Sequence, residues 1–126
     1  MLFWILAGLT VYFVNIFVPA IIYFPAEGLA NHVGSRDNSP EPSAMVGRAR
    51  RSLANLQENL PIFLTLGILA MIVDGADIEQ AILGAQIFVL ARIAYLILYL
   101  VSIPYTRSAA YAVGLFGLGM MAFALV

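Results

Sequence analysis

Three side chains on one stretch of the sequence combine groups that bind small charged molecules. In RARRSLANLQENLPIF, residues 48–63, Arg51, Asn55 and Glu58 follow one another at spacings of four and three. On a helix, these spacings place the three side chains on one face. A guanidinium there can hold a carboxylate, an amide can orient it, and Glu58 can accept hydrogen bonds from an ammonium group. The stretch therefore predicts a polar stripe along a helix.

A second polar stripe follows in RIAYLILY, where Arg92, Tyr95 and Tyr99 are spaced by three and four. A polar turn, DGADIE, separates the two stripes. Counting outwards from this turn places three pairs at equal depth to within about one residue, or about 1.5 Å of helix rise. The predicted pairs are Glu58 with Arg92, Asn55 with Tyr95, and Arg51 with Tyr99.

The helices that carry these stripes belong to a membrane protein. Hydrophobic residues make up 63% and charged residues 10% of the 126 residues, far from the composition of soluble domains. Apolar segments long enough to cross a bilayer are separated by Pro, Gly, Ser and Asp residues. We predict an all-α integral membrane protein with four transmembrane helices in a single domain, with a loop at 25–47 and helices at 2–24, 48–73, 79–101 and 108–126.

The arginines are distributed unevenly between the connections. Five of the six basic residues lie in or beside the first and third connections, at positions 36, 48, 50, 51 and 107, whereas the second connection is acidic. The positive-inside rule predicts that the first and third loops face the cytoplasm. The short chain without a basic tail favours a bacterial inner membrane.

Composition also excludes several classes of function. A net charge of -1 gives no basic excess for nucleic-acid binding, so we expect no nucleic-acid partner. No cysteine is present, so a sulfur nucleophile has to come from a ligand. The single histidine, His32, has no accompanying metal-ligand cluster, and a lone loop histidine is typical of a solvated surface residue. We therefore expect no metal site.

The cost of burying charge in a bilayer indicates where the two stripes point. A charged residue near the centre of a transmembrane helix costs about 2.5 to 3.5 kcal/mol, so Glu58 and Arg92 should face inwards and pair. Two interpretations remain. The pair holds two helices together, or the excess of donors over one carboxylate, with Arg51 and Arg107 included, binds an anionic ligand.

The same residues resemble the signature of the MAPEG family, the membrane-associated proteins of eicosanoid and glutathione metabolism. The pattern R-x-x-x-N-x-x-E followed by Pro and Phe is matched by Arg51, Asn55, Glu58, Pro61 and Phe63. Further matches are GSRD at 34–37, the second stripe, and the dipeptide Arg107-Ser108.

The resemblance implies a homotrimer that binds glutathione as co-substrate between neighbouring subunits. It assigns glutathione binding to Arg51, Asn55, Glu58, Arg92, Tyr95, Tyr99 and Arg36. Arg36 reaches a neighbour's ligand or pairs with Asp37; both interpretations stay open. Arg107 and Ser108, at the start of the last predicted helix, are the candidate catalytic residues, and Ser108 is also a candidate helix cap.

Two functions follow from this resemblance. The first is a membrane-bound glutathione S-transferase or peroxidase that activates the glutathione thiol against a lipophilic electrophile or hydroperoxide. The second is a non-catalytic protein that binds lipid or acts as a scaffold, as one member of the family does. The membrane lipid is a partner in either case.

Overall fold

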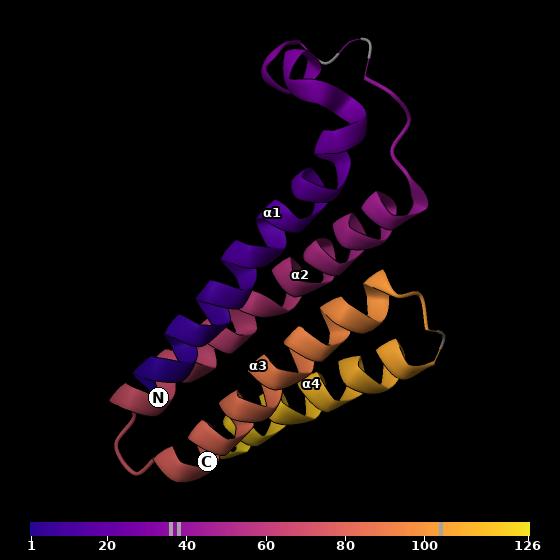
Figure 1. Cartoon of the computed structure of the whole chain (residues 1–126). Helices are drawn as coiled ribbons and strands as arrows, with labels where there is room; N and C mark the ends of the chain where they lie inside the picture. The colour runs from indigo at the N-terminus through magenta and orange to yellow at the C-terminus, as the bar shows by residue number, and fades with distance from the viewer. Residues whose placement is uncertain (36, 38, 104) are drawn as a thin grey trace.

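Four helices make up the chain, in the order α1 (Leu2–Val33), α2 (Ala44–Ile72), α3 (Ile78–Leu100) and α4 (Thr106–Phe123). The computed structural model describes residues 1–35, 37, 39–103 and 105–126. Figure 1 shows α1 beside α2 and α3 beside α4, with both termini and the α2–α3 turn at one end of the molecule. The α1–α2 and α3–α4 connections lie towards the opposite end. The predicted all-α architecture is confirmed.

Three helices of the described chain are long and apolar enough to cross a membrane: Leu2–Val33, Ala44–Ile72 and Ile78–Leu100. The sequence predicted four such spans. The fourth helix exists, but α4 opens with the polar residues Thr106, Arg107 and Ser108, which shorten its apolar run. Many large apolar side chains elsewhere are exposed, Phe3 at 70% among them, as expected for helices that face lipid.

The first helix is longer than predicted, because it extends to Val33 instead of ending at residue 24. Pro19 and Pro25 lie inside it, and the regular conformation breaks only at Gly28, with φ 75° and ψ 158°. This combination of angles is essentially restricted to glycine. The predicted loop at 25–47 therefore contains a helical end and a fold-back, and α2 begins earlier than predicted, at Ala44.

Side-chain caps fix where α2 and α3 begin. Ser43 accepts a hydrogen bond from the backbone N–H of Val46 at 3.4 Å, and Asp77 accepts one from Gln80 N–H at 3.0 Å. Each bond satisfies one of the N–H groups that have no partner inside the helix. α3 therefore starts one residue before the predicted position.

Close backbone contact holds the helices together, since lipid gives little hydrophobic drive for helix association. A Cβ on Gly84 of α3 would lie 2.6 Å from the carbonyl oxygen of Gly117 of α4, and a Cβ on Gly117 would lie equally close to that of Gly84. Neither position therefore has room for a side chain. Phe63 of α2 stacks on Phe88 of α3 with ring centroids 4.6 Å apart. This packing fixes the rotation of α2, α3 and α4 and so the direction of their polar side chains.

Candidate functional site

Tyr99 links two arginines from different helices. Arg51 of α2 donates a hydrogen bond from Nε to the Tyr99 hydroxyl of α3 at 3.2 Å. The guanidinium carbon of Arg107, on α4, lies 4.8 Å from the centre of the same ring. Arg51 is exposed, Arg107 is half-buried and Tyr99 is buried. The predicted pairing of Arg51 with Tyr99 is confirmed, and it brings residues of three helices together.

Arg92 makes a different contact from the one predicted. Its Nη1 donates a hydrogen bond to Oδ1 of Asn55 at 2.6 Å, and the residue is only 3% exposed. Glu58 is exposed and forms no ion pair or hydrogen bond among the residues that the structure describes. The predicted Glu58–Arg92 pair and the predicted Asn55–Tyr95 pair are therefore wrong within a single chain. Equal depth along two helices does not place two side chains in the interface between them, and Glu58 turns outwards.

Aromatic rings surround the Arg92 guanidinium instead of a carboxylate. Its central carbon lies 4.9 Å from the ring centre of Phe88, 5.2 Å from that of Tyr111 and 5.8 Å from that of Tyr95. The Tyr95 ring also contacts the Tyr99 ring edge-to-face, with centroids 5.3 Å apart. The electron-rich ring faces stabilise a buried cation. We call Arg51, Asn55, Arg92, Tyr99 and Arg107 together the guanidinium cluster.

The guanidinium cluster carries unbalanced positive charge. Among the described residues, none of its three arginines forms an ion pair, and their contacts are to neutral oxygens and rings. Guanidiniums without carboxylate partners attract an anion, and they bind carboxylates in a bidentate fashion. The arrangement favours an anionic ligand over an internal ion pair.

The start of α4 adds further donors beside this cluster. α4 begins at Thr106, so Arg107 and Ser108 lie in its first turn, where backbone N–H groups have no intrahelical partner. Ser108 is exposed and does not cap the helix as predicted, because the helix starts two residues earlier, after Tyr105. Arg36, which was also predicted to reach the ligand, lies outside the described residues.

A second polar cluster lies where α1 folds back, and sequence reasoning missed it. His32 bonds through Nδ1 to Oε2 of Glu27 at 2.8 Å, and Ser39 donates to Oε1 at 3.3 Å. The Tyr23 hydroxyl donates to the backbone oxygen of Pro40. Glu27 is 5% exposed, and His32 is half-buried instead of solvated as predicted. We call Tyr23, Glu27, His32 and Ser39 the carboxylate cluster.

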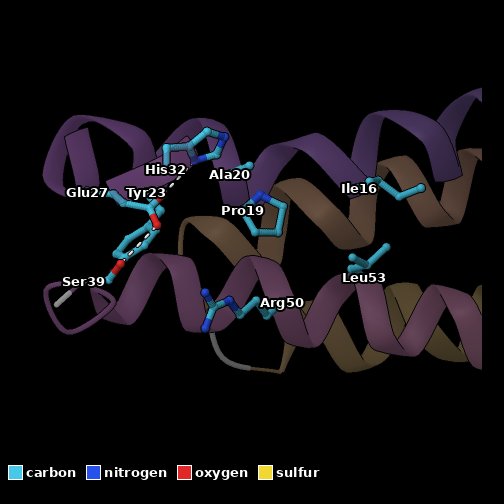
Figure 2. A pocket seen from close by; sticks show the side chains of 9 residues that line it. All are labelled: Ile16, Pro19, Ala20, Tyr23, Glu27, His32, Ser39, Arg50 and Leu53. Carbon is cyan, nitrogen blue, oxygen red and sulfur yellow. Dashed lines mark hydrogen bonds and ion pairs between the residues drawn. The ribbon is translucent and has the colours of Figure 1, made fainter. Parts of the chain in front are cut away.

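The carboxylate cluster closes one end of a cavity of about 450 Å³ between α1 and α2. Figure 2 shows its residues gathered at one end of the cavity, with Ile16 and Leu53 towards the other. Arg50 lines the cavity from α2, with its guanidinium carbon 5.9 Å from the Tyr23 ring. Glu27 and His32 are five residues apart, which does not place them on one face of a helix, so helical periodicity does not predict their contact. The signal for the fold-back in the sequence is the glycine at position 28.

Potential metal ligands do not converge in the described part of the chain. No group of three or more His, Asp or Glu side chains there is arranged to hold a metal ion.

Comparison with known proteins gives two matches. A model of the MAPEG family matches residues 1–126 of the chain. Over 70 residues the chain is 40% identical to microsomal glutathione S-transferase 1 of Bos taurus. That stretch covers 55% of this chain and 44% of the bovine protein, less than half of the relative's length. No solved structure matches the chain.

Proposed function

The chain belongs to the MAPEG family, and on this premise we propose that it is a membrane-bound, glutathione-dependent transferase or peroxidase. The observation that carries the proposal is the guanidinium cluster, three arginines from three helices without a carboxylate partner in the described structure. The name of the bovine relative, a glutathione S-transferase, supports the same reading.

Glutathione suits the charges of this site. The tripeptide carries two carboxylates and one ammonium group at neutral pH. Arg51 is exposed and keeps its two Nη groups for a carboxylate while Nε bonds to Tyr99. Asn55 supplies an orienting hydrogen bond. Glu58, exposed and without a partner among the described residues, accepts from the ammonium group.

The thiol of glutathione has to be ionised before it can react. A free thiol has a pKa of about 8.5, so only a few per cent is thiolate at pH 7. Lowering this pKa to about 6.5 takes about 2.7 kcal/mol of stabilisation of the anion. Arg107 supplies a positive charge, and the first turn of α4 supplies backbone N–H groups together with the Ser108 hydroxyl. Arg107 and Ser108 are thus the proposed thiol-activating residues.

The thiolate then attacks a lipophilic substrate that arrives through the bilayer. In transfer, sulfur forms a bond to an electrophilic carbon and the leaving group departs with the bonding electrons. In peroxide reduction, sulfur attacks a peroxide oxygen to give an alcohol and a glutathione sulfenic acid. A second glutathione converts this acid to the disulfide and water. The thiolate serves both reactions, so the site does not have to change between them.

The assembly and orientation are also part of the proposal. We place glutathione between neighbouring subunits of a homotrimer, with all four helices crossing the membrane as one domain over 1–126. The first and third connections, with their arginines, face the cytoplasm. The exposure of Arg51 and Glu58 in a single chain supports a ligand site that a second subunit completes. A bacterial inner membrane remains a prediction from the sequence.

Arg51 and its sequence neighbour Arg50 provide a test variant and a matched control. Glutathione is titrated into purified protein in detergent, and binding is followed by calorimetry and by the ultraviolet absorbance of the thiolate. We expect Arg51→Ala to weaken binding about 10- to 100-fold, because hydrogen bonds between charged groups contribute about 1.5 to 3 kcal/mol. Arg50→Ala, which removes the neighbouring charge outside the guanidinium cluster, should change affinity less than about twofold.

Two outcomes would reject the proposal. One is the absence of saturable glutathione binding to the unmodified protein. The other is equal affinity of the Arg51→Ala and unmodified proteins. Binding without thiolate formation would favour instead the non-catalytic lipid-binding or scaffold function.

A further inference from the structure

Arg92 is too deeply buried to meet a ligand that enters from the exposed side of α2. It is 3% exposed, and the rings of Phe88, Tyr95 and Tyr111 lie around its guanidinium. The backbone of α4 closes another side, since a Cβ on Gly114 would lie 3.4 Å from Nη2. Assembly into an oligomer adds cover and removes none. Arg92 therefore makes no direct hydrogen bond to such a ligand, and any directional contribution to binding must act through another residue.

That residue is Asn55, which is the one hydrogen-bond partner of Arg92 among the described residues. Nη1 donates to Oδ1 at 2.6 Å, whereas Nε and Nη2 are buried without a hydrogen-bond partner among the described residues. A guanidinium has donors only, so the Asn55 atom that faces it has to be the carbonyl oxygen. The amide nitrogen of Asn55, with two N–H donors, then points away from Arg92.

Helix geometry directs these donors towards the proposed ligand. Asn55 is half-buried, and it lies four residues after Arg51 and three before Glu58, on the same face of α2. Arg51 and the Asn55 amide nitrogen together present only hydrogen-bond donors. Such a surface binds a carboxylate, which accepts hydrogen bonds, and does not bind a cation. If the Asn55 side chain rotated by half a turn about its last bond, an oxygen would face the carboxylate and repel it.

The energetics of burial indicate that Arg92 orients the Asn55 side chain more than it stabilises the fold. Even a buried ion pair can often be replaced by apolar side chains of similar volume without loss of stability, so burial of a charge is weak evidence of a stabilising role. Two of the three guanidinium nitrogens of Arg92 have no hydrogen bond in the described structure, which is a poor arrangement for a purely structural residue. The same guanidinium gives Asn55 a single orientation. It also leaves Glu58 without an ion pair among the described residues and available for an ammonium group.

We infer that Arg92 is a positioning residue: it holds the Asn55 side-chain oxygen inwards, so that the Asn55 amide nitrogen binds a carboxylate of the ligand beside Arg51. This inference rests on the proposed function, because the ligand it concerns is glutathione. It differs from a direct contact between Arg92 and glutathione. Arg92 does not contact the ligand, but it ensures that Asn55, like Arg51, presents only hydrogen-bond donors to it.

A double-mutant cycle separates the two roles. Glutathione affinity is measured by calorimetry for the unmodified protein, Arg92→Met, Asn55→Ala and the double variant. We expect each single variant to weaken binding about tenfold and the double variant to bind no more weakly than Asn55→Ala alone. The thermal unfolding midpoint of Arg92→Met without ligand should stay within a few degrees of that of the unmodified protein.

The outcomes distinguish this inference from the proposed function. Additive losses, about a hundredfold in the double variant, would show that Arg92 acts on glutathione binding independently of Asn55 and would overturn the inference alone. No glutathione binding by the unmodified protein would reject the proposed function itself.

A second variant tests the orientation without removing Arg92. In Asn55→Asp, the carboxylate can still accept from Arg92 Nη1, but it presents an oxygen to the ligand instead of an N–H group. We expect Asn55→Asp to bind glutathione at least about tenfold more weakly than Asn55→Ala. Equal or tighter binding by Asn55→Asp would overturn the inference.

Discussion

The guanidinium cluster and the carboxylate cluster lie towards the same end of the helices, yet their charged groups find partners in opposite ways. In the guanidinium cluster, three arginines contact rings and neutral oxygens, with no carboxylate partner in the described structure. In the carboxylate cluster, one buried glutamate bonds to a histidine and a serine of its own chain. A cluster whose charges lack internal partners attracts an outside partner, whereas one whose charge is hydrogen-bonded within the chain stabilises that chain.

The difference also appears in how each cluster is assembled. The guanidinium cluster joins side chains from α2, α3 and α4, which rigid helix packing holds in place. The carboxylate cluster depends on one backbone break, at Gly28, that returns the chain onto α1. Changes in the first cluster should therefore alter ligand chemistry at nearly constant stability. Changes in the second should alter stability at nearly constant affinity for ligand.

The largest effect expected concerns Arg107. In Arg107→Ala, we expect kcat/KM with a lipophilic electrophile to fall about 100- to 1000-fold, since a single lost donor to a developing anion costs that much in other enzymes. The thiolate absorbance of the bound glutathione should fall with it, while the unfolding midpoint stays nearly unchanged. Arg107→Lys, which keeps the charge, should lose less. If the thiolate absorbance survives in Arg107→Ala, another residue activates the thiol.

Glu27 should give the converse result. Glu27→Ala leaves His32 and Ser39 without the buried oxygens that they bond to. We expect the free energy of unfolding to fall by about 1.5 to 3 kcal/mol, measured by denaturant titration in detergent micelles. Glutathione affinity should change less than about twofold. A large loss of affinity would break the comparison, because it would show that a neighbouring subunit presents this cluster to the ligand.

The sequence predicted the guanidinium cluster in part, because helical periodicity fixes which residues share a face. The predicted proximity of Arg51 to Tyr99 is correct. The prediction failed for Glu58 and Arg92, since depth along a helix does not fix the rotation of one helix against another. That rotation comes from the contact of Gly84 with Gly117 and from the stacking of Phe63 on Phe88, neither of which a single sequence reveals.

The carboxylate cluster was not predicted, for a different physical reason. Residues 25–47 have the composition of a loop, and Pro25 favours ending a helix before it. The helix nevertheless continues past Pro25 to the break at Gly28. The bonds from His32 and Ser39 to Glu27 then form across this break, so no periodic pattern describes them.

Gly28 tests whether the backbone break maintains the carboxylate cluster. A Cβ at Gly28 would meet no atom within 4 Å, so the cost of Gly28→Ala is conformational and not steric. We expect a loss of about 1 to 3 kcal/mol in the free energy of unfolding, because non-glycine residues avoid φ 75° with ψ 158°. Gly119→Ala, in open space at an ordinary helical position, is the matched control and should be neutral or slightly stabilising. Equal stability of the two variants would show that the break is not strained.

The smallest effect expected is at Tyr23, whose hydroxyl ties the first connection to α1 through the Pro40 carbonyl. Tyr23→Phe removes one hydrogen bond and keeps the ring beside Arg50, so we expect a loss of about 0.5 to 1.5 kcal/mol. Tyr12→Phe is the control, because the Tyr12 hydroxyl accepts only an exposed bond from Gln57 at 3.4 Å. That variant should stay within about 0.5 kcal/mol of the unmodified protein. If Tyr23→Phe leaves stability unchanged but weakens glutathione binding, the two clusters act on one ligand and the division between them fails.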